Sequence, residues 1–195
     1  MIDCNGCAAC QCYQGHDCVK NNDFSEVEAR SRKIFDEPEA QKILKVAAAI
    51  EAEHYMQWNR LQEIIEFCQK MGHRKIGIAM CVGLIREATS LVKILSKNFE
   101  VFSVCCKNSG ISKDDYAMPH IKESRFEASC NPIGQALILN DRQTDLNLIL
   151  GLCIGHDILF TKYSAAPVTT FAVKDRVLAH NPLGALYSGY HLRKF

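Results

Sequence analysis

The sequence lacks the features of several large classes of protein. No apolar run approaches the roughly 18 residues expected of a membrane span, and the opening Met1-Ile2-Asp3 lacks the basic start and apolar stretch of a secretory signal. Basic residues number 23 and acidic residues 22, so the formal charge of +1 gives no electrostatic reason to expect nucleic acid or an anionic membrane as the partner. We therefore expect a cytoplasmic protein whose partner is a small molecule or an electron-transfer protein.

Familiar catalytic and nucleotide-binding motifs are missing as well. The chain contains no Gly-x-Gly-x-x-Gly dinucleotide fingerprint, no Gly-x4-Gly-Lys phosphate loop, no Ser nucleophile elbow and no His-Glu-x-x-His pair. These absences leave a nicotinamide enzyme, a P-loop enzyme, a serine hydrolase and a zinc metalloprotease of that type without support.

Cysteine, by contrast, is abundant and concentrated near the start. Of the 11 cysteines, five fall at Cys4, Cys7, Cys10, Cys12 and Cys18. A disulfide framework would call for an oxidising compartment and usually an even number of cysteines, and neither condition is met. Thiolates are soft ligands for zinc and iron–sulfur clusters, and a metal can fold a short polar arm that has no hydrophobic core. We predict that residues 1–23 form a cysteine-rich metal-binding arm.

The remaining residues, 24–195, are long enough to form one α/β domain. Residues 24–72 are predicted to be helical, with a first helix over 24–35, an interruption at Pro38, and a strongly helical stretch from Glu39 to Met71 that ends at Gly72.

The segment 73–195 alternates apolar strands with helices. Short apolar runs bounded by turn residues predict strands over 75–81, 100–105, 146–152 and 168–173, and helical patterns cover 84–97 and the residues after Pro132. Such alternation is typical of a three-layer, mostly parallel, Rossmann-like four-stranded sheet with right-handed crossovers.

Four further cysteines lie where loops at the carboxyl ends of parallel strands converge, the edge at which such sheets bind ligands. They are Cys81, Cys106, Cys130 and Cys153. Cys105 and Cys106 cannot face the same side of a strand, so Cys106 is assigned to the site and Cys105 to packing. The alternative is that these are ordinary buried cysteines, which replace small apolar residues in many cores.

Five segments of the sequence resemble a known family, and the resemblance covers essentially the whole chain. They are Lys75-Ile-Gly-Ile-Ala-Met-Cys-Val-Gly-Leu84, Ser103-Val-Cys-Cys-Lys107, Cys130-Asn-Pro-Ile-Gly-Gln-Ala136, Gly151-Leu-Cys-Ile-Gly-His-Asp157 and Val173-Lys-Asp-Arg-Val-Leu-Ala-His-Asn-Pro182. The family is the predicted metal-binding proteins grouped as domain of unknown function 1847, found mainly in anaerobic bacteria and archaea. The resemblance implies metal binding and a sheet-edge site but no established reaction. It also implies that the arm ligands are Cys4, Cys7, Cys12 and Cys18, with Cys10 supernumerary.

The identity of the metal stays open between two candidates. The arm departs from the bacterial ferredoxin run, because a single residue separates Cys10 from Cys12 and Val19 stands where that run has proline. Zinc would accept the four arm thiols, or His16 in place of one of them. We prefer an iron–sulfur cluster, since the sheet edge offers a second set of thiols; all four, or three with one iron open to substrate, would hold it there.

Polar residues beside these cysteines are candidates for catalysis. His156 is a possible proton donor or ligand and Asp157 an orienting carboxylate, although Asp157 would also serve as a simple helix cap. Lys174 and Asp175 follow the last strand and are preferred over Arg176, with Lys107 opposite.

Three functions are compatible with this pattern. The first is an iron–sulfur protein that performs redox or small-molecule chemistry at the sheet edge. The second is a non-catalytic zinc-binding structural or metal-carrier module. The third, thiol redox sensing by Cys105–Cys106 or Cys10–Cys12, fits poorly with the geometry of an unstrained disulfide.

Overall fold

The structure, a computed structural model, describes residues 4–5, 11–15 and 23–195. The chain divides into two compact units, Met1–Gln57 and Trp58–Phe195. The described part of the first unit contains the short helix η1 (Gln11–Gln14) and the helices α1 (Ser25–Phe35) and α2 (Pro38–His54). No helix in the described residues combines the length and the apolarity needed to cross a bilayer.

The stretch over 39–71, predicted to be strongly helical, is divided into two helices. α2 ends at His54, Met56 takes a positive φ of 55°, and α3 (Arg60–Met71) begins after Asn59. The Asn59 side chain accepts from the amides of Leu61 and Gln62, while the Gln62 side chain accepts from the Asn59 amide. This capping box starts a new helix, and the unit boundary falls in the same interruption.

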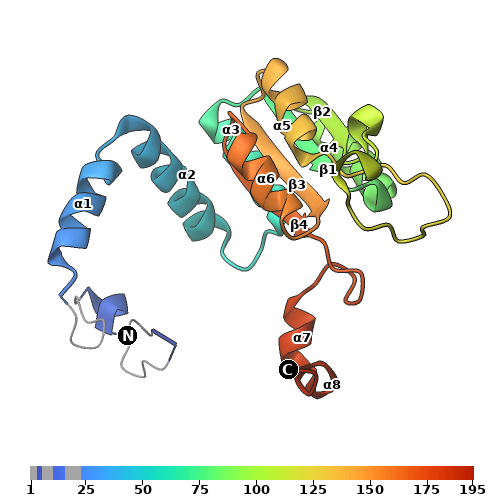
Figure 1. Ribbon diagram of the computed structural model, residues 1–195. Coiled ribbons are helices and arrows are strands. Elements are labelled where there is room, and N and C mark those ends of the chain that lie inside the picture. Colours follow the sequence, from blue (N-terminus) through green and yellow to red (C-terminus); the bar gives the residue numbers. More distant parts are fainter. Residues whose placement is uncertain (1–3, 6–10, 16–22) are drawn as a thin grey trace. The chain divides into compact units, whose positions relative to one another are not determined.

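The second unit is built on a four-stranded parallel sheet, as predicted (Figure 1). Its strands are β1 (Lys75–Met80), β2 (Glu100–Cys105), β3 (Leu146–Leu152) and β4 (Val168–Val173), arranged in the order β2-β1-β3-β4. Every pairing is parallel. All four carboxyl ends therefore point to one edge of the sheet.

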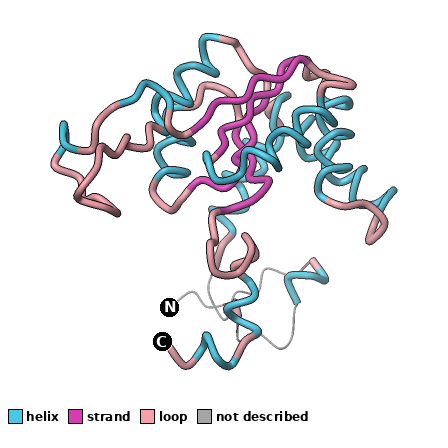
Figure 2. Tube along the Cα trace, turned by 90° about the vertical axis from the view of Figure 1, so that its right-hand side faces the viewer, coloured by secondary structure: helices cyan, strands magenta, loops and turns pink. Residues whose placement is uncertain are grey.

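Helices cover both faces of this sheet, which gives the predicted three layers (Figures 1 and 2). One core joins the strands to α3 and to α4 (Ile85–Leu95) through residues such as Cys68 and Leu91. The other core joins them to α5 (Pro132–Asp141) and α6 (His156–Tyr163) through Leu139 and Phe160. Both faces of β1 and β3 are thereby buried, which explains their nearly continuous apolar sequences.

Short elements complete the second unit. The loop after β1 contains η2 (Val82–Leu84), and the long loop after β2 contains η3 (Asn108–Gly110) and η4 (Asp114–Tyr116). After β4 the chain ends in α7 (Leu183–Tyr187) and α8 (Gly189–Leu192).

Candidate functional site at the carboxyl edge of the sheet

The site lies at the carboxyl ends of three strands, each of which is followed by a cysteine. Cys81 follows β1, Cys106 follows β2 and Cys153 follows β3, while Cys130 lies two residues before α5. In the strand order found here, β1 lies beside β3, and the helix that follows β1 (α4) and the helix that follows β3 (α6) pack on opposite faces of the sheet. In doubly wound sheets of this order the crevice between β1 and β3 is the usual ligand site. Cys81 and Cys153 border that crevice.

Cys106 and Cys130 form a hydrogen-bonded pair of thiols. Cys106 is buried and Cys130 half-buried, and the Asn131 amide donates to the Cys106 carbonyl at 2.8 Å, which holds the two segments together. The Cys106 thiol donates to Cys130, and this bond together with burial raises the pKa of Cys106. The Val82 amide also donates to the Cys106 Sγ at 3.3 Å.

The surroundings of the partner thiol, Cys130, favour its thiolate form. The hydrogen bond from Cys106, with the nearby charges of Lys107 and His156, lowers its pKa to about 5 although burial acts in the opposite direction. The Lys107 ammonium is fixed because it also donates to the Ala128 carbonyl. A thiolate held this way is ready to act as a metal ligand or nucleophile.

Cys81 is closely packed at the same carboxyl edge of the sheet. It is 8% exposed, and its neighbours include Gly151 of β3 and Leu84. Gly151 has a φ of 70°, and a Cβ there would overlap the Leu84 side chain. It also lies where the pairing of β3 with β4 shifts register. Glycine at this position therefore lets η2 approach β3 and sets the place of Cys81.

Cys153 is linked to the loop after β4 by Arg176. The guanidinium donates through Nη2 to the Cys153 Sγ at 3.2 Å. Its pKa is raised by that hydrogen bond and by the charge of Cys153, and more weakly by Cys81 and Cys130. One arginine thus lies within electrostatic reach of three thiols from three loops.

The predicted polar residues lie at this edge with distinct roles. His156 begins α6 and acts on Cys130 through its charge. The Asp157 carboxylate accepts from the Ile158 amide, as a helix-start residue does. The Asp175 carboxylate accepts from the amides of Val177 and Leu178, so it closes a turn.

The fourth predicted polar residue, Lys174, lies close to the loop that begins with Cys81. Its amide donates to the Leu152 carbonyl at 3.1 Å. Its Nζ lies 3.3 Å from the position that a Cβ on Gly83 would take, and the Cys81 Sγ lies 3.9 Å from that same point. The side chain therefore points toward the loop after β1.

Gln135 was not anticipated from the sequence. This fully buried residue of α5 donates through Nε2 to the carbonyls of Met80 at 3.1 Å and Val104 at 2.7 Å, and so clamps the ends of β1 and β2. Two carbonyl partners fix the amide orientation, because the reverse would oppose oxygen to oxygen. Its Oε1 is buried without a hydrogen-bond partner in the described part of the chain. The available signal was a polar residue on the inward face of an apolar helix.

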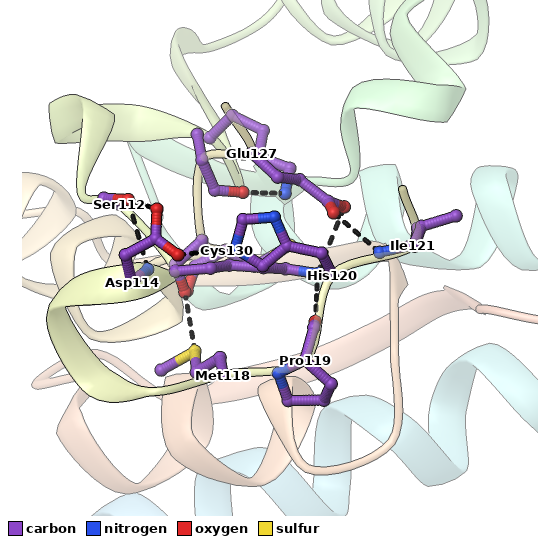
Figure 3. A network of polar contacts seen from close by, with 12 residues as sticks. Ser112, Asp114, Met118, Pro119, His120, Ile121, Glu127 and Cys130 are labelled. Atoms are coloured by element: carbon purple, nitrogen blue, oxygen red, sulfur yellow. Dashed lines mark hydrogen bonds and ion pairs between the residues drawn. The ribbon is translucent and has the colours of Figure 1, made fainter. Parts of the chain in front are cut away.

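The long loop before Cys130 is held by polar contacts (Figure 3). Lys113 and Glu127 form an ion pair at 3.1 Å, and Glu127 also accepts from the Ile121 amide at 2.7 Å. That amide bond, followed by the Lys113 contact, lowers the pKa of Glu127. Asp114 lies 3.0 Å from His120. These contacts stabilise a segment whose sequence is polar and irregular, and this segment leads to Cys130 at the carboxyl edge of the sheet.

Of the predicted arm ligands, the structure describes Cys4 and Cys12, both exposed. Cys7 and Cys18 lie outside the described residues, as do Cys10 and the alternative ligand His16. Within the described ranges, no three His, Cys, Asp or Glu side chains are arranged as a ready group for a metal ion. The roles of the arm and sheet-edge cysteines as ligands stay predictions.

Two comparisons place the chain among known sequences. Residues 18–171 match the family described as "Protein of unknown function (DUF1847)". The chain is also similar to "Uncharacterized protein MJ0455" of Methanocaldococcus jannaschii, with 56% identity over 193 residues that cover 99% of this chain and 97% of that protein. Neither description carries a reaction, a metal or a partner.

Proposed function

Because this chain belongs to the family of proteins of unknown function DUF1847, its relatives supply no reaction, and we propose a function from the site alone. The protein binds an iron–sulfur cluster at the carboxyl edge of its sheet through Cys81, Cys106, Cys130 and Cys153. It acts in redox or small-molecule chemistry in the reducing cytoplasm, with a small molecule or an electron-transfer protein as partner.

The convergence of thiols from separate loops carries this proposal. Cys106 and Cys130 share one proton, and Arg176 interacts with Cys153, Cys81 and Cys130. A proton shared by two thiols is what a metal displaces, because thiolates and not thiols are the ligands. The three or four thiolates of such a centre would come from loops that the sheet already holds in place.

The surroundings of the thiols favour a cluster. A backbone amide donates to a proposed ligand sulfur, from Val82 to the Cys106 Sγ at 3.3 Å. Lys107 and Arg176 add positive charge. Hydrogen bonds to sulfur and nearby charge are the means by which proteins tune iron–sulfur clusters. In an iron–sulfur cluster the thiolate ligands bind different iron atoms, so the ligands can come from separate loops.

The arm is proposed to hold a second centre through Cys4, Cys7, Cys12 and Cys18. Such a centre would supply electrons to the sheet edge or fold the arm as a structural zinc site does. At the edge, His156 is the proposed proton donor, because its charge acts directly on Cys130. Lys174 is the proposed substrate contact. Asp157 and Asp175 are proposed to support these residues through the turns that they close.

A non-catalytic zinc module is the alternative, and the paired thiols Cys106 and Cys130 are the observation that favours it. In a tetrahedral site with Zn–S bonds of about 2.3 Å, thiolate sulfurs are close neighbours. Two thiols in hydrogen-bond contact are half of such a site.

Metal, acid-labile sulfide and the visible spectrum of protein purified without oxygen test the proposal. We expect iron with matching sulfide and a broad absorption band. Colourless protein that contains zinc alone would establish the alternative. Protein that takes up neither metal after anaerobic reconstitution would overturn both.

Single Cys→Ser variants then locate the centre. Replacement of Cys81, Cys130 or Cys153 is expected to remove the sheet-edge metal and leave the arm loaded. The matched control is Cys105→Ser, which changes a half-buried neighbour of Cys106 and is expected to keep the full metal content. Unchanged metal in all the site variants would rule out the sheet-edge centre.

A further inference from the structure

We propose that Arg176 and Lys174 form a binding site for a small oxyanion, a carboxylate or phosphate group, at the rim of the sheet edge. Such a group would belong to the substrate of the proposed centre, so the substrate class is a small anionic molecule. This inference rests on the proposed function for its meaning, but the anion site itself can be tested without metal.

The cations at the edge fall into two kinds. Lys107 is committed to its surroundings, since its ammonium donates to the Ala128 carbonyl and acts on Cys130. Its positive charge is already used to hold a thiolate. Lys174 and Arg176 lie on the loop after β4. Arg176 makes one hydrogen bond, to the Cys153 Sγ, and keeps further donors, while Lys174 has no side-chain hydrogen bond in the described part of the chain.

Arg176 has unused capacity to bind. The residue is exposed, and in the described part of the chain its guanidinium makes one hydrogen bond, to the Cys153 Sγ. A guanidinium offers five donors in a planar fork that matches a carboxylate or a phosphate with two parallel bonds. The remaining donors can therefore receive an oxyanion while Arg176 stays beside the thiols.

Lys174 is a half-buried residue whose ammonium has no counter-ion in the part of the chain that the structure describes. Among the described residues it has no side-chain hydrogen bond and no ion pair. Removing a charge from water carries a cost that a bound anion would offset. The Lys174 Nζ lies 3.3 Å from the point that a Cβ on Gly83 would occupy, so glycine at this position lets the ammonium lie against the loop after β1.

The carboxylates close to these cations in sequence are occupied elsewhere. Asp175 accepts from the amides of Val177 and Leu178, and Asp157 accepts from the Ile158 amide. Neither forms an ion pair with Lys174 or Arg176 in the described part of the chain. The charge of Lys174 and the remaining donors of Arg176 are thus not used by these carboxylates and can bind a ligand from outside.

The test is a titration of the reduced full-length protein, both as purified without oxygen and after removal of metal by chelation. Inorganic phosphate and acetate are added separately, with chloride at matched ionic strength as the reference. Nuclear magnetic resonance signals of the Arg176 side chain and the Gly83 amide report binding. We expect saturable shifts with phosphate or acetate that chloride does not produce, and the stronger of the two identifies the chemistry.

Variants give the decisive comparison. Arg176→Gln and Lys174→Gln are each expected to weaken the apparent affinity, read at the Gly83 amide, by at least about tenfold, since each removes a charged hydrogen bond. Arg193→Gln, an exposed arginine beyond α8, is the control and should titrate as the unaltered protein does. Shifts that match those of chloride, or an Arg176→Gln protein that titrates normally, would overturn the anion site.

The two proposals fail separately. Loss of saturable anion binding in protein that contains iron and sulfide would reject the anion site and leave the cluster. Anion binding that persists after reconstitution has failed to load any metal would reject the cluster and leave the rim as an anion site of a different kind of protein.

Discussion

The paired thiols of Cys106 and Cys130 have the same chemistry and opposite ionisation. Cys106 donates the shared proton and is buried, so its pKa is raised. Cys130 receives that hydrogen bond and lies near Lys107 and His156, so its pKa falls to about 5. The hydrogen bond, burial and the neighbouring charges together favour Cys130 as the thiolate.

This difference predicts the pH dependence of alkylation. A group with a depressed pKa is ionised above that pKa, so the rate of Cys130 alkylation in metal-free protein should rise around pH 5 and reach its plateau below neutral pH. Iodoacetamide labelling followed by peptide mass spectrometry measures this rate. Lys107→Gln is expected to move the midpoint upward, because it removes a cation that favours the thiolate.

Lys122→Gln provides the comparison for that experiment. Lys122 is an exposed lysine of the same loop and is not among the groups that act on Cys130. Its replacement should leave the midpoint in place. A Cys130 rate that keeps rising toward pH 9 in the unaltered protein would contradict the hydrogen-bonded arrangement described here.

At the scale of elements, the close approach of η2 to β3 depends on Gly151. Its φ of 70° is costly for other residues, and a Cβ would meet Leu84. Leu152 then packs with α5 and α6, although Leu146, Leu148 and Leu150 pack on the other face. The register shift at Gly151 produces this change of face, as strand irregularities near sites commonly do.

Gly151→Ala is accordingly expected to lower the free energy of unfolding by about 2 kcal/mol or more, from the backbone strain and the clash. Urea denaturation followed by circular dichroism measures the change. Gly189→Ala is the control, because Gly189 lies in α8 with no positive φ and an added Cβ would make only an ordinary contact with Arg193. Equal stability of the two variants would show that Gly151 tolerates a side chain.

Sequence patterns predicted most elements of the second unit and only part of its site. Three strands have the predicted bounds, since buried parallel strands read as apolar runs between turns. The break before α3 was missed because an apolar pattern continues across Tyr55–Asn59. The end of one helix and the start of the next depend there on the capping contacts of Asn59. Strand ends indicated which cysteines share an edge, but the contacts of Arg176 and Gln135 depend on side-chain directions that periodicity does not contain.

At the scale of the molecule, the division into Met1–Gln57 and Trp58–Phe195 separates the two proposed metal centres. All four sheet-edge cysteines belong to the second unit, and all five arm cysteines belong to the first. Each core cluster of the second unit is formed by residues of that unit alone.

We therefore expect a fragment of residues 58–195 to fold and to keep the sheet-edge thiols in their arrangement. Circular dichroism and a cooperative urea transition would show the fold, and the Cys130 labelling profile would show the site. The same fragment is expected to keep the proposed sheet-edge metal and to lack the proposed arm metal. An unfolded fragment would mean that the second unit needs the first for its stability.

The clamp formed by Gln135 has a consequence for the order of assembly. It joins the ends of β1 and β2 through protein atoms alone, so the positions of Cys81 and Cys106 do not depend on a bound metal. The proposed centre would therefore be built on a sheet edge that has already folded, and loss of its metal would leave that edge in place.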